Sequence, residues 1–520
     1  MFGTLVSQLP IRLPAISYQA IAPEMILFGA ALVVLALSAT IGRREHPELY
    51  RGIGLLAALG EGAWSANLLR LVDKHGPSLA IAGAIANDGF AAVVGIIVAA
   101  ALVLTMLIGP GFVRSVAGQG PEFVTLLLIS ATGAIVMAQA EDLIVIFLGL
   151  EILSIALYIM VGFRLRDGLS REAAFKYFIL GGFSSAVFLY GVALVYGATG
   201  STNLLKIGSF LSTHVLINNG VLLFGIALIL VGFGFKISAV PFHVWSPDVY
   251  QGAPTSVTGY MAAMAKIAAF SALLRVLTVA FHLQLQYWRP IVIGLAVLSL
   301  VFGAVFALRQ REVKRMLAYS SINHAGFILL GVLAATSGGT RDALFYLAAY
   351  SVMVIGTFGL ISLIQVDAGK TEGSLSLTEV RGLGQRRPAV AILLAILVLA
   401  QAGAPFTSGF IAKFSVITAV IAVNEYWIAV VAMITAAIAV AFYLRLVLAL
   451  FARDEQTAGV GDALYPVPVR GGSDAGLVQS SRAAQVPVWI GIWLSVAITV
   501  FFGVFPTLLL NLVAKGKIFL

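Results

Sequence analysis

Four charged residues lie inside long apolar stretches of the sequence, where charges are rare. Glu151 lies in FLGLEIL, Lys236 in FGFKI, Lys266 in MAKIA and Lys413 in FIAKF. A charge at the centre of a membrane helix costs about 2.5–3.5 kcal/mol on insertion scales. Burial disfavours the charged form, whereas a nearby opposite charge favours it. A buried lysine with a carboxylate partner can therefore gain and lose a proton, which is the chemistry of a proton relay.

A fifth residue, His324, follows a polar run that contains Ser320, Ser321 and Asn323. Histidine titrates near neutrality, so His324 is a possible further relay residue. A hydrogen-bonded structural histidine explains it equally well. For each lysine taken alone, a structural ion pair or a side chain that reaches the membrane surface is the alternative. Several such charges near two helix breaks favour the relay.

The two breaks carry a similar pattern, AVPF ending at Phe242 and GAPF ending at Phe406. They lie 164 residues, or five predicted spans, apart, so the second copy enters the membrane inverted. Paired interrupted spans at matching positions are typical of inverted-repeat transporters. Each proline frees a backbone carbonyl, here those of Ile237 and Gln401, which must find a polar partner in a membrane. Either proline alone is compatible with an ordinary kink.

The elements that hold these residues are predicted to be membrane helices. The chain has 520 residues, of which 60% are hydrophobic and 11% charged. A bilayer accommodates such a composition, whereas a water-soluble fold does not. We predict an all-α polytopic membrane protein of about fourteen transmembrane helices. Their predicted starts lie near positions 22, 51, 89, 122, 141, 173, 218, 254, 289, 314, 342, 388, 424 and 486.

The spans group into five predicted regions. These are 1–120 with helices 1–3, 121–285 with helices 4–8, 286–451 with helices 9–13, a cytoplasmic loop at 452–485, and 486–520 with helix 14. Residues 1–20 do not resemble a cleaved signal peptide. Most of the 32 Lys and Arg residues follow odd-numbered spans, so both termini are predicted on the non-cytoplasmic side. This pattern explains the net charge of +9 without a nucleic-acid partner.

Other acidic residues receive simpler interpretations. Glu24 is expected to be a favourable charge in the first turn of a helix. Glu141 and Asp142 are expected to be solvated at a span boundary, and Asp248 to be a turn or cap residue. Glu61 lies isolated inside the second span, and no role is predicted for it.

Several cofactor classes are excluded by the sequence. The chain has no cysteine, which excludes disulfides, thiolate zinc sites and cysteine-bound iron–sulfur clusters. It contains neither a G-x-x-x-x-G-K-[ST] phosphate loop nor a G-x-G-x-x-G fingerprint. We therefore expect no cofactor in this chain, and the driving force must come from a gradient or from partner subunits.

Three segments resemble the antiporter-like membrane subunits of respiratory complex I, the NADH:quinone oxidoreductase. They are 236–254 (KISAVPFHVWSPDVYQGAP), 314–322 (KRMLAYSSI) and 409–414 (GFIAKF). The resemblance covers roughly residues 120–450. It implies two inverted five-helix repeats with broken helices, spans four to eight and nine to thirteen. It also implies residue roles: Glu151 and Lys236 as a charge-switching pair, Lys266 as a connecting relay, and Lys413 at the exit half-channel.

Within that family, the span count and the lysine at position 413 resemble subunit N, because sister subunit M typically has a glutamate there. The chain lacks the long lateral helix of subunit L, and Gly403-Ala404-Pro405 departs from the usual G-I-P turn. The resemblance implies a bacterial inner-membrane location and contacts with subunits M, K and J. NAD, FMN, iron–sulfur clusters and quinone are expected in partner subunits. The alternatives are a subunit of a multisubunit sodium/proton antiporter and a purely structural membrane scaffold.

Overall fold

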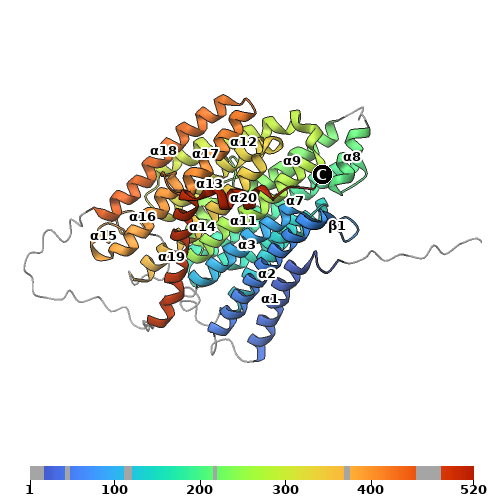
Figure 1. The fold of residues 1–520 in the computed structure, drawn as a ribbon. Coiled ribbons are helices and arrows are strands. Elements are labelled where there is room, and N and C mark those ends of the chain that lie inside the picture. The colour runs from blue at the N-terminus through green and yellow to red at the C-terminus, as the bar shows by residue number, and fades with distance from the viewer. Residues whose placement is uncertain are drawn as a thin grey trace, which may run out of the picture.

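Long helices run side by side through the protein and form a single bundle (Figure 1). The structure is a computed structural model that describes residues 17–40, 47–109, 120–214, 219–367, 375–452 and 482–519. Within these ranges, eleven helices are long and apolar enough to cross a membrane. The predicted all-α polytopic class is confirmed, whereas the count of fourteen spans stays a prediction.

The N-terminal region contains three long helices and a short hairpin. They are α1 (Ala22–Thr40), α2 (Pro47–His75), β1 (Ser78–Ala80), β2 (Ile85–Asn87) and α3 (Gly89–Ile108). The two strands pair in antiparallel fashion, with Leu79 opposite Ala86. Asp88 begins α3 by accepting a hydrogen bond from the Ala91 amide at 2.8 Å, which satisfies one of the free donors at a helix start.

The next region corresponds to the predicted first repeat. Its helices are α5 (Gly120–Gln139), α6 (Leu143–Val161), α7 (Gly168–Thr199), α8 (Leu204–Thr213), α9 (Gly220–Lys236), α10 (Trp245–Gly252) and α11 (Thr255–Arg275), which continues as a π-helix (Val276–Ala280). Asp142 and Asp167 cap α6 and α7 at their starts. Gly200 ends α7 at φ 73°, a left-handed conformation that glycine adopts without strain.

The predicted second repeat follows. A short 3-10 turn (His282–Gln284) leads into α12 (Leu285–Arg309), α13 (Val313–Leu333), a second 3-10 turn (Ala335–Ser337), α14 (Gly339–Asp367), α15 (Leu383–Arg386), α16 (Pro388–Ala402), α17 (Ser408–Ala422) and α18 (Tyr426–Phe451). The chain ends with α19 (Arg482–Val504) and α20 (Pro506–Ala514). The tail after α20 returns to the start of α3, where the Phe90 amide donates to the Lys517 carbonyl at 3.1 Å.

Helices α11, α13 and α14 form the centre of the bundle, and nearly all of their described side chains are buried. Helix α11 packs against α14, and α10 packs against α13, so the two repeat regions meet there. Helices α7 and α18 lie outside, and Phe183 and Leu448 expose 72% and 62% of their surface. A hydrocarbon solvent accepts such side chains, as expected for lipid-facing helices.

Each predicted span start falls within a few residues of the start of a long helix. Helices α8, α10, α15, α17 and α20 and the hairpin were not predicted as separate elements, because they are too short to give a 20-residue apolar signal. Most of the predicted loop at 452–485 lies outside the described residues.

Candidate functional site

The first break follows Lys236, the last residue of α9. Residues 237–244 are not helical, and Ser238 takes a positive φ of 62°. The Trp245 indole Nε1 donates to the Phe235 carbonyl at 2.9 Å, and the Trp245 ring stacks on Tyr177 with centroids 4.5 Å apart. These contacts hold the broken chain and satisfy a carbonyl near the break.

Lys236 is 3% exposed, and its ammonium group contacts two hydroxyl groups. Its Nζ donates to Ser154 Oγ at 2.8 Å and to Tyr177 OH at 3.2 Å. Ser154 belongs to α6, and its hydroxyl donates in turn to the Leu150 carbonyl. A buried lysine is thus held by neutral groups that both donate and accept hydrogen bonds.

Glu151 lies on α6 one turn before Ser154, so its side chain lies on nearly the same face of the helix. It is half-buried, and its Oε1 atom has no hydrogen-bond partner among the described residues. Among the described residues, no ion pair within 4.0 Å joins Lys236 to Glu151. The ammonium group of Lys236 instead contacts the hydroxyl of Ser154, which lies one helical turn after Glu151 on α6.

Lys266 lies on α11, between the two repeat regions. It is 2% exposed, and its Nζ donates to Ser321 Oγ of α13 at 2.6 Å. The same Ser321 hydroxyl lies 3.0 Å from Tyr250 OH and accepts from Tyr350 OH at 2.8 Å. Tyr250 belongs to α10, directly after the first break. Ser321 therefore joins hydroxyl groups from α10 and α14 to the buried lysine of α11.

His324 continues this polar line one turn further along α13. Its Nδ1 lies 2.7 Å from Tyr346 OH, and its Nε2 lies 3.2 Å from Tyr443 OH. Its ring centroid is 4.8 Å from that of Tyr350, which contacts Ser321. Both ring nitrogens have partners, so the geometry suits a relay histidine and a structural histidine alike.

Lys413 lies on α17, after the second break. Helix α16 ends at Ala402 with Gly403 in a left-handed conformation at φ 96°. Lys413 Nζ donates to the Ala402 carbonyl at 2.8 Å and lies 5.0 Å from the centre of the Phe327 ring on α13. The lysine therefore occupies the break itself. The carbonyls that gain side-chain donors are those of Phe235, Ala402 and Ala404 rather than the predicted Ile237 and Gln401.

The hydroxyl residues between the charges were not predicted. Ser154, Tyr177, Tyr250, Ser321 and Tyr443 lie on different helices, and serine and tyrosine occur throughout such proteins. Two of them carried a sequence signal, because Ser154 lies three residues after Glu151 and Ser321 lies in the polar run before His324. Hydroxyl groups exchange donor and acceptor roles by rotation, so a chain of them can pass a proton between buried amines.

Asp248 of α10 forms ion pairs rather than acting as the predicted turn or cap residue. Lys176 of α7 and Arg315 of α13 contact its carboxylate at 2.7 and 2.6 Å. Burial opposes ionisation of this carboxyl, but the bonds from Lys176 and Arg315 outweigh it and hold the pKa of Asp248 below its usual value. The short helix after the first break is thereby fixed to both repeat regions.

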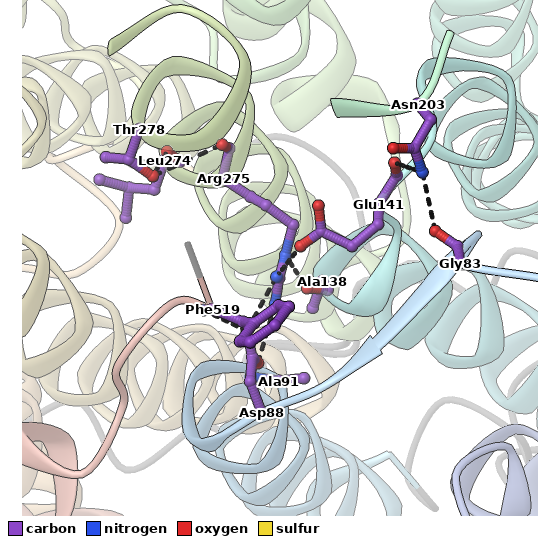
Figure 2. Close-up of polar contacts among 10 residues, drawn as sticks. All are labelled: Gly83, Asp88, Ala91, Ala138, Glu141, Asn203, Leu274, Arg275, Thr278 and Phe519. Atoms are coloured by element: carbon purple, nitrogen blue, oxygen red, sulfur yellow. Dashed lines mark hydrogen bonds and ion pairs between the residues drawn. The ribbon is translucent and has the colours of Figure 1, made fainter. Parts of the chain in front are cut away.

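A second charged cluster lies around Arg275, the last residue of α11 (Figure 2). Arg275 of α11 is fully buried, and its Nη1 lies 2.8 Å from Asp88 and 2.5 Å from Glu141. The Phe519 amide of the C-terminal tail also donates to Asp88, at 3.0 Å. The prediction that Glu141 is solvated is wrong, because a cation 134 residues away in the sequence folds against it. Breaking such a buried pair is strongly destabilising.

The comparisons with known proteins agree with this geometry. Residues 140–439 match the family described as NADH:quinone oxidoreductase/Mrp antiporter, transmembrane. NADH-quinone oxidoreductase subunit N of Salinispora arenicola is 38% identical over 98% of this chain and 99% of its own length. The same subunit of a Parafrankia species is 41% identical over 84% of this chain and 86% of its own. A chain of respiratory complex I from Thermus thermophilus is 32% identical, with a TM-score of 0.74, covering 95% and 100%.

Broken helices, buried lysines and hydroxyl side chains between them define an antiporter-like membrane subunit. With the family match and relatives over nearly its full length, the chain belongs to the NADH-quinone oxidoreductase subunit N family. Among the described residues, no group of three or more His, Asp or Glu side chains is arranged to hold a metal ion.

Proposed function

We propose that this chain moves protons across the bacterial cell membrane as a membrane-arm subunit of the proton-translocating NADH:quinone oxidoreductase. The observation that carries the proposal is a set of three hydrogen-bonded clusters in the otherwise apolar interior between the two breaks. One cluster surrounds each of Lys236, Lys266 and His324, and serine and tyrosine hydroxyls supply the partners. Quinone reduction elsewhere in the complex supplies the energy.

Each candidate residue has a separate role. Glu151 and Lys236 form the pair whose separation controls the charge on the lysine. Lys266 connects the two repeats through Ser321. His324 extends the path toward the second break, and Lys413 releases the proton there. Arginine does not replace these lysines, because it does not lose its proton.

The chain is proposed to work with other membrane subunits of complex I, namely antiporter-like subunit M and the small subunits K and J. NAD, FMN, iron–sulfur clusters and quinone are proposed to reside in partner subunits. Two features support this division: the sequence contains no cysteine, and the relatives over most of the chain are named as single subunits of the oxidoreductase. The bacterial inner membrane is the proposed location, with both termini on the non-cytoplasmic side.

Proton uptake by vesicles that contain the assembled complex tests the proposal. Glu151→Ala and Lys236→Ala should each assemble, and each should lower NADH-driven proton uptake by more than about tenfold, within the range that proton-transfer groups supply. Lys206→Ala is a matched control, since Lys206 lies exposed on α8. Parental uptake by both relay variants would contradict the proposal.

The sodium/proton antiporter alternative makes a different prediction. The matching family includes Mrp antiporters, so the fold alone does not separate the two functions. Relatives named subunit N over nearly the full chain favour the oxidoreductase. Sodium-dependent transport in the absence of NADH oxidation would favour the antiporter instead.

A further inference from the structure

Two buried carboxyl groups lie in the N-terminal helices, outside both repeats. Glu61 of α2 is fully buried, and Glu24 of α1 is 9% exposed. Both carboxyl oxygens of Glu24 and the Oε2 atom of Glu61 are shielded from solvent and have no hydrogen-bond partner among the described residues. An unpaired buried carboxylate is expensive, so these three atoms require an explanation.

The helices place the two side chains beside each other. Helices α1 and α2 are antiparallel neighbours (Figure 1). On one side of the pair, the Trp64 indole donates to the Gln19 carbonyl at 3.0 Å, and on the other a side chain at Gly60 would lie 3.7 Å from Ile26. These contacts bracket Glu24 and Glu61 at the same level, where the two groups interact electrostatically.

No described cation neutralises this pair. Helices α1, α3 and α5 pack against α2, and their described charged residues are Glu24 itself and Glu122. On α2, Arg51 lies ten residues before Glu61 and pairs with Glu48 at 2.5 Å. The other cations of α2 are exposed toward its C-terminal end: Arg70, Lys74 and His75.

The surroundings of Glu61 are tightly packed and polar on one side only. Ser65 donates to its Oε1 atom at 2.7 Å. A side chain at Gly95 of α3 would lie 3.0 Å from the same oxygen, so only glycine fits there. Two adjacent carboxylates repel each other strongly in a low dielectric, and a proton removes one charge. That proton also supplies the donor that the remaining oxygens lack.

We propose that Glu24 and Glu61 form a second proton-holding site, in which the two carboxyl groups share at least one exchangeable proton. The site lies near one end of the helix pair, because Glu24 is the third residue of α1 and follows a turn in which Tyr18 is 64% exposed. In the predicted orientation this turn faces the non-cytoplasmic side. The site lies outside the repeats and does not depend on the relay between the breaks.

Infrared difference spectroscopy of the assembled complex in lipid tests this site. Spectra are recorded between acidic and alkaline pH, in the region where protonated carboxyl groups absorb. The parent should show a band that disappears as the pH rises, and the double variant Glu24→Gln/Glu61→Gln should lose it. Glutamine has nearly the same shape and donates hydrogen bonds, so assembly should persist. Glu48→Gln, an exposed position on α2, is the matched control and should keep the band.

Three outcomes would overturn the proposal. An unchanged band in the double variant would show that the titrating protons belong to other residues. The absence of a pH-dependent band from the parent would show that the pair does not exchange its proton in this range. Equilibrium dialysis with sodium tests whether the two carboxylates bind a metal ion instead of a proton. Sodium binding by the parent that is lost in the double variant would overturn the proposal in favour of a sodium site. If the double variant does not assemble, each single glutamine variant should lose part of the band. None of these readouts depends on whether Lys236 carries pumped protons, so failure here and failure of the relay are distinguishable.

Discussion

The two proline breaks carry similar sequences but satisfy their backbone groups differently. At the first break, the Phe235 carbonyl accepts from the Trp245 indole. At the second, the Ala402 carbonyl accepts from Lys413 itself. The indole never carries a charge, whereas the lysine does. The first break therefore leaves Lys236 to contact side-chain hydroxyls, and the second ties its lysine to the backbone.

Because of this difference, the two lysines are expected to contribute differently to stability and to proton transfer. Helix α16 ends at Ala402, and a cation near a helix C-terminus is stabilised by the aligned carbonyls. Lys413 therefore contributes to the stability of the break as well as to the proposed relay. Lys236 is also at a helix end, the last residue of α9, but its ammonium donates to side-chain hydroxyls rather than to a backbone carbonyl, so its proposed role is mainly proton transfer. In the first repeat, Trp245 satisfies the backbone carbonyl and Lys236 is the proposed proton carrier. In the second repeat, Lys413 has both roles.

The two repeats are predicted to be inverted relative to each other, and cysteine labelling from one side of the membrane tests this. Each position should be labelled either fully or not at all. Arg166→Cys lies between α6 and α7, and Ser337→Cys lies between α13 and α14, which are the corresponding connections of the two repeats. Both positions are exposed, and the parent chain has no cysteine to give background. An impermeant thiol reagent on intact cells should label Ser337→Cys only. Labelling of both from the same side would refute the inversion.

Substitution of Lys413 should separate stability from pumping. Lys413→Ala leaves the Ala402 carbonyl without its donor and should lower the free energy of unfolding by about 1–3 kcal/mol. Lys413→Arg keeps a donor but cannot release a proton. Pumping should fall by more than about tenfold in both variants, while only the alanine variant loses thermal stability.

The measurements are proton uptake normalised to assembled complex and thermal unfolding of that complex. Parental pumping by the arginine variant would remove Lys413 from the relay and leave it as a structural lysine. Lys206→Ala should change neither quantity, because this side chain is exposed on α8.

His324 lies between the breaks, and its substitution gives an intermediate effect. Glutamine donates and accepts hydrogen bonds to Tyr346 and Tyr443 but does not titrate near neutrality. His324→Gln should lower proton uptake by up to about tenfold, a smaller effect than the roughly 10²–10⁴-fold that a directly acting proton-transfer group supplies. His282→Gln, an exposed histidine outside the path, is the control. An unaffected His324→Gln complex would identify His324 as a structural histidine.

The smallest effect is expected for the indole at the first break. Trp245→Phe removes the donor to the Phe235 carbonyl and should cost about 1–2 kcal/mol of stability. Trp288→Phe is the matched control for Trp245→Phe. The Trp288 Nε1 atom also donates to a backbone carbonyl at 2.9 Å, that of Phe281, in the connection between α11 and α12. Thermal unfolding should show similar losses, with proton uptake near parental in both. A large loss of pumping in Trp245→Phe alone would show that the first break also combines stability and transport in one side chain.

Hydropathy predicted the long helices because transfer into a bilayer is close to a sum over each segment's own residues. For this reason the predicted starts near 89, 314 and 388 lie within one residue of the starts of α3, α13 and α16. Helix α10 was not predicted, because it has only eight residues. Its position depends on the ion pairs of Asp248 with Lys176 and Arg315. Such a helix is stabilised by partners from elsewhere in the chain, which a local window does not contain.

The sequence alone identified four charges in apolar runs, Glu151, Lys236, Lys266 and Lys413, because a charge among apolar residues is visible without a structure. The three lysines are buried and Glu151 is half-buried. Only the tertiary structure decided what each one contacts. Ser154 next to Lys236 and Ser321 next to Lys266 lie 82 and 55 residues away in the sequence. The same holds for Glu141. The sequence predicted that it is solvated, whereas in the structure it is buried in an ion pair with Arg275. A hydrogen bond depends on a few ångströms between side chains, and helix packing, rather than spacing along the chain, fixes those distances.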